Sequence, residues 1–119
     1  MAAGFRPSEH IRRRADFQQI YEHGIRTRGR WLTIFLLARD RSEGRRGIAA
    51  TKKLGGAVER NRAKRLIREV FRRNKIAPGF DVVVVPKREV LDASLTALEA
   101  EYRQTVGQGL RRQIRAGRD

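Results

Sequence analysis

The side chains best suited to chemistry in this sequence are arginines and lysines, and the chemistry they favour is phosphate binding. Seven basic residues lie between Arg60 and Arg73, against only Glu59 and Glu69. At about 100° per residue, one helix face holds Ala63, Leu66, Ile67, Val70 and Phe71, and the opposite face holds Asn61, Lys64, Arg65, Arg68 and Arg72. A charge run usually marks a solvated face, but such faces normally mix signs. We therefore expect one face to pack on a core and the other to bind a polyanion.

No constellation for catalysis accompanies this basic helix. His10 and His23 stand singly at the two ends of a first helical region, and a lone histidine is more often a surface residue than a catalyst. The sequence has no cysteine and no HExxH, paired-carboxylate or phosphate-loop spacing. We therefore expect no catalytic residue and no metal ligand in this chain, and a protein that acts by binding an anionic partner.

The composition agrees with an anionic partner. The chain has 119 residues, enough for a single domain spanning 1–119, and a net charge of +15. No apolar run approaches the roughly 18 residues of a membrane span, so we expect no membrane partner and a cytoplasmic protein. Residues 1–10 are expected to form a flexible basic arm, and residues 111–119 a disordered basic tail.

The chain reads as an α+β protein with elements in the order α-β-β-α-β-α. The basic helix falls between two apolar stretches, and a strand–helix–strand order favours a parallel pair, which base rates make right-handed. We expect a mixed central sheet with helices packed on it, a small α/β sandwich. The first predicted elements are a helix over 13–23 with Gly24 as its cap and a basic loop over 25–30. Two strands follow, over 31–39 and 47–53, joined by a polar hairpin loop over 40–46. After the basic helix come a buried strand over 80–85 and a last helix, which is capped by Asp92 or Ser94 and runs to about Gln113.

The stretch before and within the basic helix resembles the signature of a known family. Its residues are Lys52-Lys53-x-Gly55-x-Ala57-Val58-x-Arg60-Asn61-Arg62-x-Lys64-Arg65-x-Ile67-Arg68-Glu69. This pattern is similar to the Arg-Asn-Arg motif of the bacterial ribonuclease P protein subunit, and the likeness extends from about Ile11 to about Tyr102. The resemblance implies a ribosomal-protein-like fold with a left-handed strand–helix–strand crossover, contrary to the base rate.

The resemblance also implies a partner and a reaction. In that family the catalytic subunit is an RNA, which uses Mg2+ to hydrolyse one phosphodiester and remove the 5′ leader of precursor tRNA. The protein is the non-catalytic subunit of this endoribonuclease, paired with one RNA, and has no intrinsic cofactor. The residues matching its RNA-binding helix and the preceding loop are Lys53, Arg60, Asn61, Arg62, Lys64, Arg65, Arg68 and Arg72.

A second surface is implied for the leader itself. Phe17 and Tyr21 are four residues apart, a spacing that by base rate marks a core pair, and Phe35 could equally be an ordinary core residue. In the family, aromatic side chains at these places line a cleft for the single-stranded leader, where stacking tolerates any base. The residues expected to line this cleft are Arg12, Phe17, Tyr21, Phe35, Ala50 and Lys52.

Other classes remain compatible with charge and size. A ribosomal or general RNA-binding protein of similar build would show no dependence on a tRNA leader. A DNA-binding module would usually place its recognition helix in a helix-turn-helix, whereas this helix sits between predicted strands. An independent nuclease is the least favoured, because no site for it is visible.

Overall fold

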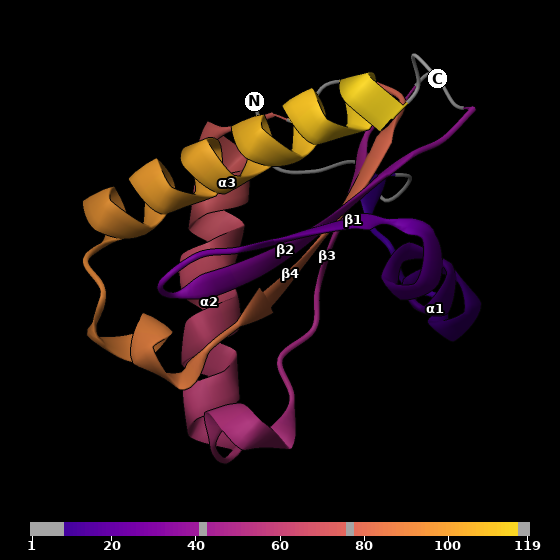
Figure 1. Ribbon diagram of the computed structural model, residues 1–119. Coiled ribbons are helices and arrows are strands. Elements are labelled where there is room, and N and C mark those ends of the chain that lie inside the picture. Colours follow the sequence, from indigo (N-terminus) through magenta and orange to yellow (C-terminus); the bar gives the residue numbers. More distant parts are fainter. Residues whose placement is uncertain (1–8, 41–42, 76–77, 117–119) are drawn as a thin grey trace, which may run out of the picture.

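The computed structural model describes residues 9–40, 43–75 and 78–116, and arranges helices on both faces of one sheet (Figure 1). The order along the chain is helix, three strands, helix, strand, helix, with two short 3-10 helices, η2 and η3. The bounds are α1 Arg14–His23, β1 Ile25–Arg28, β2 Leu32–Ala38, β3 Arg45–Ile48, η2 Lys52–Leu54, α2 Ala57–Arg73, β4 Phe80–Pro86, η3 Arg88–Asp92 and α3 Leu95–Ala116.

The sheet has four strands in the order β1-β2-β4-β3. β1 pairs with β2 and β2 with β4 in antiparallel fashion, while β3 and β4 are parallel. The predicted mixed sheet and the predicted parallel pair flanking the basic helix are therefore confirmed. The handedness of the crossover through α2 stays a prediction.

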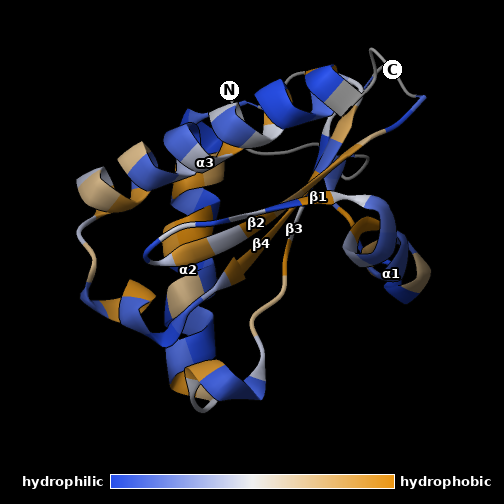
Figure 2. Cartoon of the chain, viewed as in Figure 1, coloured by the Kyte–Doolittle hydropathy of each residue, from blue (hydrophilic) through white to orange (hydrophobic). Residues whose placement is uncertain are grey.

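The two faces of the sheet are covered unequally. On one face, α2 and α3 enclose the larger core, whose fully buried members include Ile34, Leu36, Ile67, Val84 and Leu98. On the other face, the short α1 covers a smaller cluster around Ile20 and Val83. Figure 2 shows the apolar colour on the strands and on the inner sides of the helices, with α2 strongly hydrophilic elsewhere. Because α1 is short, part of its face of the sheet stays accessible.

Two predicted boundaries in the first half of the chain are wrong. The stretch 25–30, expected as a loop, contains β1, in which Thr27 is buried and Arg26 and Arg28 are exposed. It is an edge strand whose outward charges discourage further pairing. The stretch 40–46 is not a hairpin loop, because β4 lies between β2 and β3, and Arg45 and Arg46 already belong to β3.

The second predicted strand is also shorter than expected. Instead of spanning 47–53, β3 ends at Ile48, and Lys52 and Lys53 lie in η2. Its partner β4 ends at Pro86, which has no N–H to donate, so the parallel ladder closes with the Ala49 N–H bonding the Val84 carbonyl oxygen (2.9 Å).

The predicted terminal segments have different outcomes. Most of the expected arm over 1–10 lies outside the described residues, and His10 forms an isolated parallel bridge with Arg46. The last helix begins where Ser94 Oγ accepts the Ala97 N–H (3.1 Å), as predicted for a Ser94 cap. It continues to Ala116, so the first part of the stretch predicted as a disordered tail is helical, and residues 117–119 lie outside the described part.

Candidate nucleic-acid interface

The entry to the basic helix is fixed by two glycines. Gly55 has φ +144°, a conformation that L side chains rarely adopt. The N-cap residue of α2, Gly56, has no side chain that could cap the helix. Instead Glu59 reaches back to accept the Gly56 N–H (2.8 Å). The chain thus turns sharply from η2, where Lys52 and Lys53 are exposed, into α2.

The outward face of α2 presents most of the predicted cations to solvent. Arg62, Arg65, Arg68 and Asn61 are exposed, whereas Arg60 and Lys64 are partly buried. None of these four arginines and one lysine forms an ion pair with a carboxylate in the part of the chain that the structure describes. Their charges remain available to an anionic partner, as in a phosphate-binding surface.

Arg72 differs from the other predicted contacts. Its guanidinium bonds Glu69 on the same helix, with Nε 3.0 Å from Oε1, and Arg73 bonds the same carboxylate. These hydrogen bonds, led by that from Arg72, lower the pKa of Glu69 to about 2. Glu69 therefore offsets part of the charge at the C-terminal end of α2, and the unpaired charge is concentrated in its first three turns.

A cleft of about 420 Å³ lies between α1 and the segment that follows β3. Four of the six residues predicted for the leader cleft line it: Arg12, Phe17, Tyr21 and Ala50. The Phe17 and Tyr21 rings are 6.4 Å apart, and Tyr21 is 40% exposed. Partial burial raises the pKa of Tyr21 above its usual value, which further favours the neutral phenol. An accessible aromatic ring beside cationic side chains suits a single-stranded nucleic acid.

The remaining two predicted cleft residues lie beside this cleft. Phe35 packs edge-on against Tyr21, with ring centroids 4.9 Å apart, and lines a neighbouring hollow on the sheet. Lys52 is exposed in η2 and is not among the residues lining the cleft. The predicted strand over 47–53 would have carried Lys52 on the same strand as Ala50, but β3 ends at Ile48.

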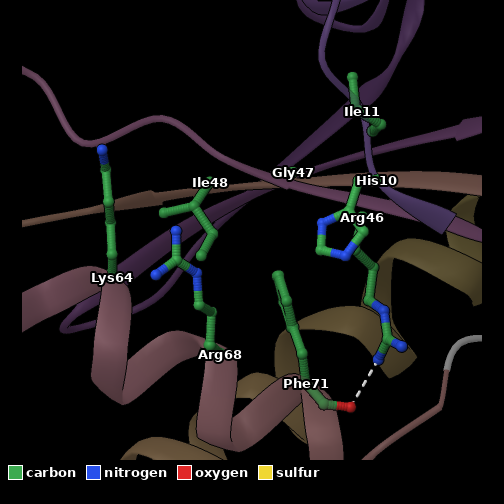
Figure 3. A pocket seen from close by; sticks show the side chains of 8 residues that line it. All are labelled: His10, Ile11, Arg46, Gly47, Ile48, Lys64, Arg68 and Phe71. Carbon is green, nitrogen blue, oxygen red and sulfur yellow. Dashed lines mark hydrogen bonds between the residues drawn. The ribbon is translucent and has the colours of Figure 1, made fainter. Parts of the chain in front are cut away.

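The cleft and the basic helix meet at Lys64. This residue lines the cleft and also a smaller pocket of about 160 Å³ at the edge strand β3. Figure 3 shows Lys64 and Arg68 projecting from α2 toward β3, with His10 on the other side of the pocket. Because Lys64 belongs to both, the basic face of α2 and the predicted leader cleft form one continuous surface.

His10, at the edge of this surface, has a lowered pKa because of desolvation and the nearby Arg12, Arg68 and Arg46.

Two buried arginines, which sequence reasoning missed, hold the helices against β3. Arg45 forms two hydrogen bonds to the buried Asp81 (3.0 and 2.7 Å) and one to Asp16 of α1 (3.4 Å). Arg46, facing the opposite way, donates to the Phe71 and Asn74 carbonyl oxygens at the end of α2 (2.7 and 2.6 Å; the first is drawn in Figure 3). Charge-assisted bonds of this kind fix the geometry of the groups they join.

The described residues include no group of three or more His, Cys, Asp or Glu side chains that could hold a metal ion. Within the same residues, no helix is both long and apolar enough to cross a membrane.

Comparison with known proteins decides between the candidate classes. The sequence profile of the Ribonuclease P family matches residues 5–109. The chain belongs to the ribonuclease P protein family. This membership makes it a component of a ribonucleoprotein that acts in tRNA processing, with ribonuclease P RNA as its partner, and the alternatives of a ribosomal protein and a DNA-binding module fall away.

Individual relatives agree with the family assignment. The ribonuclease P protein component of Clostridioides difficile is 32% identical over 105 residues, covering 86% of this chain and 92% of the relative. That of Syntrophus aciditrophicus is 46% identical over 82 residues, covering 67% and 69%. The solved ribonuclease P protein of Thermotoga maritima superimposes with a TM-score of 0.72 at 31% identity, covering 81% and 93%, and that of Staphylococcus aureus with 0.72 at 29%, covering 83% and 93%. These likenesses confirm the predicted family and fold class.

Proposed function

We propose that this ribonuclease P protein binds the catalytic RNA through α2 and the loop before it, and the 5′ leader of precursor tRNA through the cleft beside α1. The observation that supports this division most directly is the position of Lys64, which lines the cleft from within the basic helix. A leader held in the cleft would then lie against the surface that binds the RNA subunit.

The basic helix would act by neutralising phosphate charge. Each lysine or arginine that contacts a phosphate releases condensed counterions, so affinity falls steeply with salt. Residues proposed for this role are Lys53, Arg60, Arg62, Lys64, Arg65 and Arg68, with Arg72 contributing less because Glu69 binds it. Asn61, which is uncharged, is proposed to contact the RNA by hydrogen bonding. Since these cations replace part of the counterion atmosphere, the assembled enzyme should need less Mg2+ than the RNA alone.

The cleft would provide an affinity that mature tRNA cannot obtain. Stacking of a base on an exposed aromatic ring contributes about 1–3 kcal/mol and is tolerant of sequence. Tyr21, with Phe17 behind it and Arg12 and Arg14 at the rim, offers such a surface. A precursor would therefore bind more tightly than its product, which has no leader.

The hydrolysis itself is assigned to the RNA. Mg2+ prefers carboxylate and other oxygen ligands, and the described residues contain no group of three or more His, Cys, Asp or Glu side chains that could enclose it. We assign Mg2+ to the RNA subunit and the substrate, with one protein per RNA. The proposed compartment is the cytoplasm, where bacterial precursor tRNA is made.

The test is cleavage of precursor tRNA at low Mg2+ by a bacterial ribonuclease P RNA, with and without this protein. Leaders from zero to about ten nucleotides reach into the range of about 4–16 nucleotides that is usual for single-strand binding sites. We expect the protein to restore cleavage and its effect to grow with leader length. Tyr21→Ala should reduce the leader-dependent part of the effect and leave the affinity for the RNA subunit intact. A protein with no effect at any leader length would refute the proposal.

A further inference from the structure

An exposed apolar side chain at the start of the basic helix has no part in the roles assigned so far. Within the described residues, the large apolar side chains that remain exposed are Tyr21, Val58 and Ile114. Tyr21 belongs to the cleft, whereas Val58 lies in the first turn of α2 and is 76% exposed. We propose that Val58, with Asn61 beside it, binds the base of one unpaired nucleotide of the RNA subunit. The inference rests on the RNA-binding role proposed for α2 and adds a base contact to its phosphate contacts.

The fold gains little from a valine at position 58. Val58 takes part in neither of the two cores, and Gly56 and Ala57 before it are also exposed. A β-branched residue has a lower helix propensity than alanine, leucine or lysine. Single exposed apolar residues are common on protein surfaces, but this one stands within a face made of cations. A contact with the partner of that face is therefore the role left to it.

The neighbours of Val58 on the helix surface supply the other contacts that a nucleotide needs. Residues three and four positions apart are adjacent on a helix, which places Asn61 and Arg62 beside Val58, and both are exposed. The amide of Asn61 can donate to and accept from the edge of a base. Arg62 forms no ion pair within the described residues and can bind the phosphate. The methyl groups of Val58 can then pack on the face of the base.

The charge around this patch favours an RNA over an apolar protein partner. Lys52 and Lys53 are exposed in η2, which adjoins α2, and Arg65 continues the basic face farther along the helix. Glu59, the acidic residue of the first turn, is turned back to the Gly56 N–H (2.8 Å). A single valine among cations is too small for the core of a protein interface, where several apolar or aromatic side chains are buried together. It matches the size of one nucleobase.

The base must be unpaired, because the faces of paired bases are covered by their neighbours in the stack. The major groove of an RNA helix is also too deep and narrow for side chains to read. Specific recognition of RNA therefore uses loops and bulges, where bases can be splayed out. Such a base presents a face to an apolar side chain and an edge to a hydrogen-bonding group, the two contacts that Val58 and Asn61 offer.

The dependence on salt separates this contact from the phosphate contacts. Val58→Ala removes both γ-methyl groups, and losing their partial burial should weaken binding by about 3- to 15-fold. Because no charge is lost, the slope of log affinity against log salt should stay the same, whereas each lost phosphate contact changes it by about 0.7–0.9. Alanine is the better helix former, so the variant should unfold at the same temperature as wild type or a higher one. A loss of stability therefore cannot be the cause of weaker binding.

The experiment measures the affinity of the protein for a bacterial ribonuclease P RNA over a series of salt concentrations. The variants are Val58→Ala and Val58→Ile, of which the second retains the apolar surface. The matched control is Ile114→Ala, which removes an exposed apolar side chain from α3. The RNA in each complex is also treated with dimethyl sulfate, kethoxal and a carbodiimide, which together modify the pairing edges of all four bases where these are unpaired.

We expect Val58→Ala to bind more weakly at every salt concentration and to lose the protection of an unpaired base that wild type protects. Val58→Ile and Ile114→Ala should behave as wild type does. If Val58→Ala binds as tightly as wild type, or protects the same bases, the base contact is overturned while the role of α2 in RNA binding stands. A loss of affinity accompanied by a changed salt slope would mean that the substitution acts through the neighbouring cations, which also overturns it. If wild type shows no salt-dependent affinity for the RNA, this inference and the proposed function fail together.

Discussion

The shape of the proposed leader cleft depends on the absence of a side chain at Gly47. A Cβ built there would lie 2.9 Å from Phe17 Cζ and 3.1 Å from Ile11 Cβ. Carbon atoms in contact normally stay about 3.5–4.0 Å apart. Gly47→Ala should therefore push the Phe17 ring outward by about 0.5–1 Å, toward the cleft that this ring lines.

The magnitude can be worked from that displacement. Overpacking in a filled core costs about 1–3 kcal/mol, which for a chain of this size lowers the melting temperature by roughly 4–12 °C. If the shifted ring halves a stacking contribution of about 2 kcal/mol, leader-dependent affinity should fall about fivefold. The measurements are thermal unfolding of the protein and the affinity of the assembled enzyme for precursor tRNA with and without a leader.

Gly107→Ala provides the matched control. A Cβ at this position in α3 would meet only Arg111 Nη1, at 3.5 Å, an ordinary contact. Replacing a helical glycine by alanine should stabilise the protein by about 0.5–1 kcal/mol and leave leader affinity unchanged. If Gly47→Ala were as stable as wild type and bound leaders equally well, the Phe17 ring would not rest on Gly47, and the proposed link between β3 and the cleft would be wrong.

Three further predictions follow from the helices and the buried polar groups. Arg65→Gln with Arg68→Gln should weaken binding to the RNA subunit and reduce the salt slope by about 1.4–1.8; an unchanged slope would contradict the assembly role of α2. Asp81→Asn should lower the free energy of unfolding in urea by about 3 kcal/mol, because it leaves the buried Arg45 charge without its main partner, and a loss below about 1 kcal/mol would show that the pair is dispensable. Burial raises the pKa of Tyr102 from 10.0 to about 12. Between these values the unfolded chain releases a proton that the folded chain retains, so stability should fall as pH rises through this window, and Tyr102→Phe should reduce the fall in urea titrations.

Hydrophobic patterning was sufficient to predict the main elements of the fold. The apolar stripe of α2 packs on the core as expected, with Ala63, Ile67, Val70 and Phe71 buried. The valines of β4 are covered on both faces, Val82 and Val84 by one core and Val83 by the other. These elements were predictable because burial of a periodic apolar face determines them locally.

The errors fall where charge and pairing partners decide the structure. The arginine-rich sequence of β1 is typical of a loop, but the segment pairs with β2 and buries Thr27 against α3, where Arg112 donates to its hydroxyl (3.4 Å). In the same way Glu101 of α3 accepts the N–H groups of Arg30, Trp31 and Leu32 (2.6–2.8 Å), which closes the turn before β2. Both contacts join residues about seventy or more positions apart, and no local pattern reports them.

For the proposed site, the sequence predicted most of the residues but not their partners in space. Spacing placed the basic residues on the exposed face of α2, but it could not show that Glu69 binds Arg72. The resemblance placed Phe17 and Tyr21 in one cleft, but it did not separate Phe35 into the neighbouring hollow. That distinction depends on how far α1 extends over the sheet, which is a matter of three-dimensional packing.

The adjacent Arg45 and Arg46 explain how the two proposed surfaces keep their relative position. Strand alternation sends Arg45 to the face of α1, where it reaches Asp16, and Arg46 to the end of α2, where it bonds the Phe71 carbonyl. One short strand therefore holds both the helix that lines the cleft and the helix proposed to bind the RNA subunit. Desolvation of the buried Arg46 guanidinium lowers its pKa and costs free energy. Its two hydrogen bonds to the Phe71 and Asn74 carbonyl oxygens offset part of this cost. A sequence with so many solvent-exposed arginines gives no sign that these two are internal, because the difference lies in their partners and not in their type.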